Sequence, residues 1–104
     1  MYRILDLNYL MMNDKEAFYA KLEESLNTTT KFPAEYMYKF IVPAGGNQVQ
    51  EIESLFVDKS AKFAKKASKT GKYFSVSIRV VLGSSKEVIL YYKKAENIKG
   101  IISL

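Results

Sequence analysis

The fold is decided by residues 68–82, Ser-Lys-Thr-Gly-Lys-Tyr-Phe-Ser-Val-Ser-Ile-Arg-Val-Val-Leu, which predict a tight turn followed by a strongly alternating strand. Apolar side chains occupy every second position from Phe74 onward, and most positions between them are polar. A period of two residues is typical of a strand with one buried side. We therefore expect a strand from Tyr73 to Leu82 whose buried side is formed by Phe74, Val76, Ile78, Val80 and Leu82.

Weaker patterns predict the remaining elements. Asn13 and Glu16 have the spacing of a capping box, and Asn47 is a second candidate cap. Apolar stripes at helical spacing then predict helices over 14–26, 48–57 and 86–95. Alternating residues predict strands over 36–42, 62–68 and 98–104. The turn Lys69-Thr70-Gly71-Lys72 joins the strand 62–68 to the strand 73–82 as a hairpin.

This order predicts an α+β protein with a ferredoxin-like βαββαβ sandwich. Residues 1–30 form an N-terminal extension with one helix, and residues 31–104 form the ferredoxin-like domain. Right-handed crossovers place both helices of the domain on one face of a four-stranded antiparallel sheet. Tyr38 and Phe40 are expected on the covered face with the apolar residues of the strand 73–82. The other face is expected to carry Lys39, Ser75, Ser77 and Arg79.

Composition excludes several kinds of site. The 104 residues contain no cysteine and no histidine, so disulfides, cysteine nucleophiles and the commonest general base are excluded. No pair of carboxylates is spaced for acid–base catalysis or for metal binding, so we expect no enzyme, no cofactor and no metal. Asp6 and Asn8 interrupt the apolar start, and no apolar run is long enough to span a membrane. A cytoplasmic location without membrane contact is the expectation.

The charge is unevenly distributed along the chain. Residues 1–58 hold five basic and nine acidic residues, whereas residues 59–104 hold eleven basic and two acidic ones. The basic half favours either an anion-binding surface or an edge strand whose lysines discourage pairing with other chains. Nucleic-acid binding is an alternative function, but Tyr73 is the only aromatic expected on the open side of its strand, and RNA-binding sheets of this topology stack bases on several aromatics.

The chain also resembles the YbeD-like family of bacterial domains of unknown function. The likeness depends on Phe32-Pro33 with Tyr36 to Lys39, on residues 68–77, on residues 88–93 and on the ending 98–104. It implies a ferredoxin-like fold similar to small-molecule-sensing regulatory domains, and it implies no catalytic residue. Residues 1–11 lie outside the shared region, so we hypothesise that natural translation begins at Met11 or Met12.

We therefore predict a non-enzymatic regulatory or adaptor module that binds a small anionic ligand or a partner protein. Cations neutralise anionic groups and serine hydroxyls supply hydrogen bonds. A homodimer is a further expectation, because an open sheet face and exposed edges need covering. The candidate contact residues are Lys39, Lys66, Lys72, Ser75, Ser77 and Arg79.

Overall fold

The structure is a computed structural model that describes residues 5–6 and 12–104, with side chains from residue 15 onward. Its elements are β1 (Leu5–Asp6), α1 (Met12–Thr29), β2 (Ala34–Pro43), α2 (Gln48–Leu55), β3 (Lys62–Ala67), β4 (Tyr73–Leu82), α3 (Ser85–Ala95) and β5 (Ile102–Ser103). The strands form one sheet in the order β1-β5-β2-β4-β3, and every pair is antiparallel. The predicted α+β class with an antiparallel sheet is confirmed.

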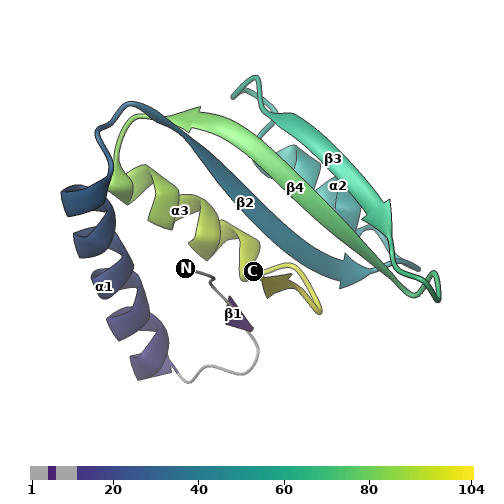
Figure 1. The fold of residues 1–104 in the computed structure, drawn as a ribbon. Coiled ribbons are helices and arrows are strands. Elements are labelled where there is room, and N and C mark those ends of the chain that lie inside the picture. The colour runs from purple at the N-terminus through teal and green to yellow at the C-terminus, as the bar shows by residue number, and fades with distance from the viewer. Residues whose placement is uncertain (1–4, 7–11) are drawn as a thin grey trace.

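Helices α2 and α3 lie on the same side of the sheet, and α1 packs against α3 (Figure 1). Buried residues of α2 and α3 join those of β2 and β4 in a single core. On the other side of β2, β4 and β3, no helix of the described residues covers the sheet (Figure 1). The molecule therefore has one covered and one open sheet face.

The predicted alternation of the two long central strands is confirmed. Strand β4 has the predicted bounds, and its register with β2 runs without interruption from Ala34 opposite Leu82 to Pro43 opposite Tyr73. Tyr38 and Phe40 are fully buried, whereas Lys39 between them is exposed. A slip of one residue would reverse the two faces, so this register fixes which side chains reach solvent.

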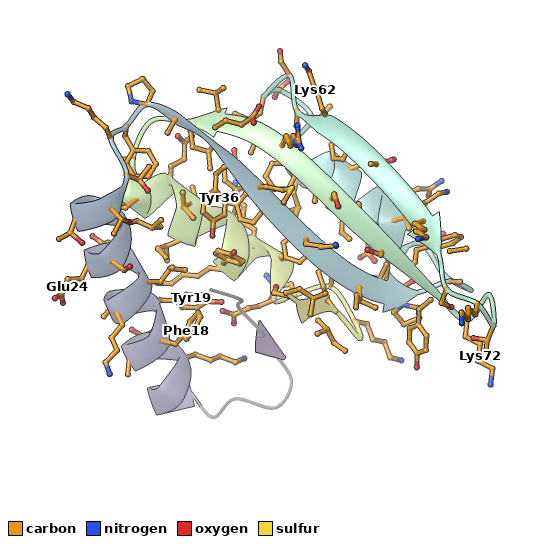
Figure 2. All side chains as sticks on the ribbon, in the orientation of Figure 1. Phe18, Tyr19, Glu24, Tyr36, Lys62 and Lys72 are labelled. Atoms are coloured by element: carbon orange, nitrogen blue, oxygen red, sulfur yellow. The ribbon has the colours of Figure 1, made fainter. Side chains whose placement is uncertain are left out.

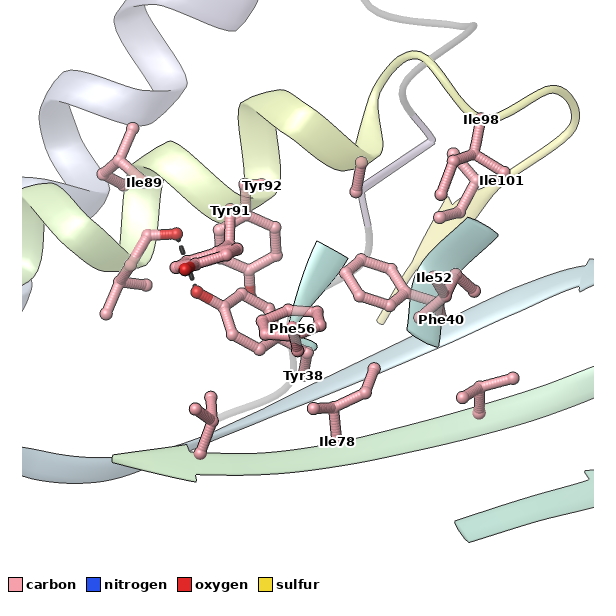
Figure 3. Close-up of a cluster of buried hydrophobic side chains, with 14 of the residues drawn as sticks. Tyr38, Phe40, Ile52, Phe56, Ile78, Ile89, Tyr91, Tyr92, Ile98 and Ile101 are labelled. Carbon is pink, nitrogen blue, oxygen red and sulfur yellow. Dashed lines mark hydrogen bonds between the residues drawn. The ribbon is translucent and has the colours of Figure 1, made fainter. Parts of the chain in front are cut away.

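Aromatic side chains from both layers fill the core (Figure 3). Tyr38 donates its hydroxyl hydrogen to the Val88 carbonyl at 2.8 Å, so the phenol is buried without losing a hydrogen bond. The Phe56 and Tyr91 rings stack with centroids 4.6 Å apart. Burying each such side chain contributes about 1.5–3 kcal/mol, which makes this layer the main source of stability.

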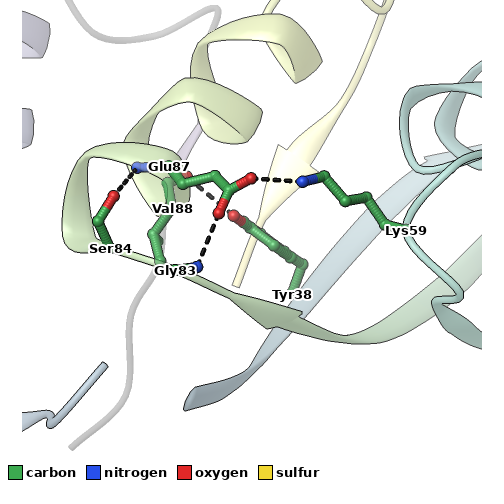
Figure 4. A network of polar contacts seen from close by, with 6 residues as sticks. All are labelled: Tyr38, Lys59, Gly83, Ser84, Glu87 and Val88. Atoms are coloured by element: carbon green, nitrogen blue, oxygen red, sulfur yellow. Dashed lines mark hydrogen bonds and ion pairs between the residues drawn. The ribbon is translucent and has the colours of Figure 1, made fainter. Parts of the chain in front are cut away.

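The start of α3 is fixed by a small polar network (Figure 4). The Ser84 hydroxyl caps the helix by accepting from the Glu87 N–H at 3.1 Å, as expected from a serine at this position. The Glu87 carboxylate accepts from the Gly83 N–H at 2.7 Å and pairs with Lys59 at 2.6 Å. The Gly83 hydrogen bond and then the Lys59 ammonium lower the pKa of Glu87 below its usual range.

Helix boundaries differ from the prediction at three places. Helix α1 already begins at Met12, so Asn13 lies inside the helix and is not its cap. It continues to Thr29, whose hydroxyl bonds to the Ser25 carbonyl one turn earlier and so does not compete with the helix. The predicted cap Asn47 makes no side-chain capping bond, and α2 ends at Leu55 where the Phe56 N–H turns back to the Glu53 carbonyl.

The end of the chain was predicted wrongly in detail. A strand was expected over 98–104, but β5 holds only Ile102 and Ser103. Gly100 has φ +75°, a conformation that favours glycine, and the turn around it directs Ile98 and Ile101 into the core.

The N-terminal extension packs onto the rest of the chain. Strand β1, which the sequence did not predict, pairs with β5. The proposed division at residue 30 stays a prediction. The translation hypothesis concerns residues 1–11, most of which lie outside the described residues.

Candidate functional site

The candidate site is the open face of the sheet, built from the outward side chains of β2, β4 and β3. Their alternation places one residue in two on this face, opposite the core. Lysine, arginine, serine and a few large apolar residues supply most of its surface. The open face comprises Glu35, Met37, Lys39, Ile41, Lys62, Ala64, Lys66, Tyr73, Ser75, Ser77, Arg79 and Val81.

Strand register arranges its cations in neighbouring rows. Lys39 lies opposite Ser77, and the next row holds Arg79 opposite Lys62. Lys66 lies opposite Ser75. Directly opposed residues of antiparallel strands have Cβ atoms about 4.5–5.5 Å apart, so each pair shares one local surface. The rows place cations and hydroxyl groups where a single anionic partner can contact several of them.

The structure brings together five of the six predicted contact residues. Lys39, Lys66, Ser75, Ser77 and Arg79 all lie on the open face.

The sixth, Lys72, lies in the turn between β3 and β4, outside both strands (Figure 2). Sequence reasoning also missed Lys62, which lies opposite Arg79. The signal was available, because a hairpin closed by residues 69–72 aligns position 62 with position 79.

The open-face cations are not neutralised by neighbouring carboxylates. Among the residues that the structure describes, the ion pairs are those of Lys15 with Glu96, Lys59 with Glu87, and Lys86 with Glu23, and all three lie away from the open face. On β2, β4 and β3 the open face has four cations, namely Lys39, Lys62, Lys66 and Arg79, and one carboxylate, that of Glu35. Its charge is therefore positive and available to an external anion.

Large apolar side chains are exposed among these cations. Met37 is 45% exposed, Tyr73 47% and Val81 62%. Single exposed apolar residues are ordinary on protein surfaces, but three on one sheet face form a pattern. Methionine, tyrosine and arginine are enriched in protein–protein interfaces, whereas lysine is depleted there. This combination suits a mixed polar and apolar contact.

A shallow cavity of about 260 Å³ opens at the hairpin end of the open face. Ile41 and Tyr73 are among its apolar lining residues, and Lys66 and Ser75 are among its polar ones. The remaining lining residues are Ala67, Ser68, Lys69 and Phe74. Its chemistry suits an apolar group next to a negative charge.

A second cavity of about 230 Å³ lies between α1 and α3. The Tyr19 hydroxyl donates to a Glu96 carboxylate oxygen at 2.6 Å, and Lys15 lies 3.4 Å from the other oxygen. Burial, and then the bond to Glu96, raise the pKa of Tyr19, so its phenol stays protonated and acts as a donor. The cluster therefore joins the two helices.

The described residues contain no group of three or more acidic side chains that would hold a metal ion. None of their helices is long and apolar enough to cross a membrane.

The chain belongs to a family described as protein of unknown function (DUF493), whose model matches residues 27–103. This match is consistent with the YbeD-like resemblance, but the description of the family does not include the name YbeD. No curated protein and no solved structure matches the chain significantly. The matched segment includes β2, β3, β4 and therefore the whole open face.

Proposed function

We propose that this protein is a non-enzymatic regulatory or adaptor module whose open face binds an acidic surface of a partner protein. The observation that carries the proposal is the set of four cations on a sheet face that no described helix covers. Lys39, Lys62, Lys66 and Arg79 make no ion pair with the described residues, so a partner carboxylate does not have to displace an internal one.

We further propose that the fold is ferredoxin-like. Without β1, the sheet reads β5-β2-β4-β3, so the first and third strands of the domain are central and α2 and α3 connect strands across one face. The YbeD-like resemblance, the regulatory role and a cytoplasmic location belong to the same proposal. The resemblance is supported by the residues quoted above and is consistent with the family match. The regulatory role and the location are supported by the composition and by that resemblance.

The size of the open face favours a transient contact. At about 3.3 Å per residue and 4.8 Å between strands, β2, β4 and β3 offer roughly 410 Å² of sheet. Two such sides bury roughly 800 Å², which is below the standard protein–protein interface and within the range of transient signalling contacts. A regulatory module that binds and releases its partner fits this area.

A small anionic ligand is supported less well than a protein. The cavity beside Lys66 holds about 260 Å³ and is open, whereas pockets that enclose a drug-sized molecule usually have about 300–1,000 Å³. The cavity suits one side chain of a partner better than a whole metabolite. The apolar wall formed by Ile41 and Tyr73 would receive that side chain, and Lys66 would face a neighbouring carboxylate.

RNA binding and self-association through this face are also supported less well. Tyr73 is the only aromatic among the described open-face residues, whereas Tyr38 and Phe40 face the core. Sheet domains that read RNA stack two or three bases on aromatic side chains, and this stacking platform is missing here. A second copy docked on the same face would bring cations against cations.

The test is a comparison of partners captured by three forms of the protein. Wild type, the double variant Lys39→Glu/Arg79→Glu and the control Lys21→Glu/Lys31→Glu are immobilised and incubated with lysate of the natural host. Both variants change the net charge equally, but the control residues are exposed outside the sheet. Captured proteins are quantified by mass spectrometry, with and without nuclease.

We expect a partner that wild type and the control retain and that the open-face variant loses at least tenfold. A partner set that is the same for all three forms would contradict the proposal. Loss of the captured partner after nuclease treatment would favour the nucleic-acid alternative.

A further inference from the structure

The outer edge of the sheet at β3 is a second surface, which adjoins the open face at Lys62 and Lys66. β3 is the last strand in the sheet order, and all six of its residues are exposed. Its register with β4 runs one residue to one from Lys62 opposite Arg79 to Ala67 opposite Phe74, without a bulge or a proline. Proteins commonly shorten, bend or cover such an edge because it offers unpaired backbone groups to another strand.

The hydrogen-bond pattern identifies which backbone groups are free. The Ser68 N–H donates to the carbonyl of the directly opposite Tyr73 at 2.9 Å. Because bonded and non-bonded pairs alternate along an antiparallel ladder, the backbone of every second residue before Ser68 bonds inward to β4. Phe63, Lys65 and Ala67 therefore direct their N–H and C=O groups outward, in a row with a spacing of about 6.8 Å.

The charge of this edge selects its occupant. Lys62 and Lys66 lie on the open side of β3, and Lys65 lies on the other side. A second copy pairing through its own β3 would place lysines near lysines, which is unfavourable across paired strands. In an extended segment with alternating acidic residues, all acidic side chains lie on one side of the sheet. Whichever side that is, they lie near a lysine of β3.

We propose that the β3 edge, formed by residues 62–67, accepts an extended acidic segment of another protein as an additional strand. Outward N–H and C=O groups of Phe63, Lys65 and Ala67 bond to the backbone of the segment, and the lysines select for acidic side chains. This mode of recognition adds a strand to an exposed sheet edge. It goes beyond the proposed function, because the segment bonds to backbone groups of the edge, although Lys62 and Lys66 also belong to the open face.

The experiment uses a fluorescein-labelled peptide of about eight residues that alternates glutamate and threonine, a length typical of strands. Its affinity is measured by fluorescence anisotropy at low and physiological salt. A peptide with lysine in place of glutamate is the charge control. We expect saturable binding of the acidic peptide and none of the basic one.

Two variants at Lys65 separate backbone bonding from charge. Lys65→Gln removes the charge and keeps the outward N–H, whereas Lys65→Pro removes both. Proline is tolerated on an edge strand where its nitrogen faces solvent, so β3 should still pair with β4. We expect the proline variant to bind at least about fivefold more weakly than the glutamine variant, which corresponds to one net hydrogen bond.

Hydrogen exchange measured by NMR provides a readout in the wild-type protein and does not depend on how a variant folds. Peptide binding should slow exchange of the amides of Phe63, Lys65 and Ala67. Unchanged exchange at these amides, or equal binding by both Lys65 variants, would overturn the inference and leave the lysines as edge protection only.

The double variant Lys39→Glu/Arg79→Glu distinguishes the two proposals. If it retains the slowed exchange at the β3 edge but captures the same partners as wild type, the open-face proposal fails and the edge inference stands. In a second outcome, the double variant no longer binds the peptide, and the peptide does not slow exchange of the β3 amides in wild type. The peptide then binds the open face, and the edge inference fails.

Discussion

Replacing Ile78 and Arg79 separately with alanine tests whether β4 has one buried and one free side. The two residues are neighbours, but Ile78 is fully buried beneath the helices and Arg79 is exposed on the open face. Tyr38 and Phe63 lie opposite Ile78 on the adjacent strands. The same substitution at adjacent positions should therefore have very different consequences for stability.

The expected size follows from burial. Ile78→Ala removes about three buried carbon groups, worth roughly 2.4 kcal/mol at about 0.8 kcal/mol each. The cavity that remains raises the loss of unfolding free energy to roughly 3–4 kcal/mol. Arg79→Ala removes an exposed side chain without an ion pair among the described residues, so its effect should stay within about 0.5 kcal/mol. Folded domains have only about 5–15 kcal/mol of stability, so the first change is large.

Urea denaturation followed by circular dichroism measures both values. The slope of free energy against urea should match that of wild type, so that a shift of the midpoint reports stability. If Arg79→Ala lost as much unfolding free energy as the roughly 3–4 kcal/mol expected for Ile78→Ala, both sides of β4 would be buried. The description of a sheet with one covered and one open face would then be wrong. A loss below about 1 kcal/mol for Ile78→Ala would also contradict the packing described for the core.

Three further outcomes are expected. Ser84→Ala removes the cap of α3 and should cost about 1 kcal/mol of unfolding free energy, measured by urea denaturation; no change would mean that the hydroxyl does not cap the helix. Because the Gly83 N–H lowers the pKa of Glu87, this carboxylate adds stability above about pH 4.5 that is lost as the pH falls through its lowered pKa. The variant Glu87→Gln should therefore lose less stability than wild type over that acidic window, and parallel pH profiles of the urea midpoint would contradict this. Tyr38→Phe removes the bond to the Val88 carbonyl and should cost about 1 kcal/mol by the same assay, whereas a stability equal to wild type would argue against that bond.

The central strands could be predicted from the sequence because apolar side chains recur at every second position along them. The pattern from Tyr73 to Leu82 gave the correct bounds, and Tyr38 and Phe40 gave the correct face of β2. A strand that is buried on one side needs an apolar residue at every second position, and this pattern is visible in the sequence. Five of the six predicted contact residues share the open face for the same reason, since position on that face follows directly from the alternation.

The bounds of the two short strands, β1 and β5, could not be predicted in this way. β1 and β5 each contain two residues, which is too short for a period to be visible. The turn at Gly100 interrupts the strand expected over 98–104, and only its backbone conformation reveals why. Lys72 is predicted to lie near the open face, but it lies in the turn between β3 and β4, outside both strands (Figure 2).

The binding role of the open face is tested most directly by NMR chemical-shift mapping with the partner that wild type captures. The amides of Lys39, Ser77 and Arg79 should shift on titration, and those of Leu22 and Leu90 on the helices should not. The shifts should shrink as salt is raised, because the contact is between opposite charges. Shifts confined to α1 and α3, with the amides of β2 and β4 unchanged, would contradict the account.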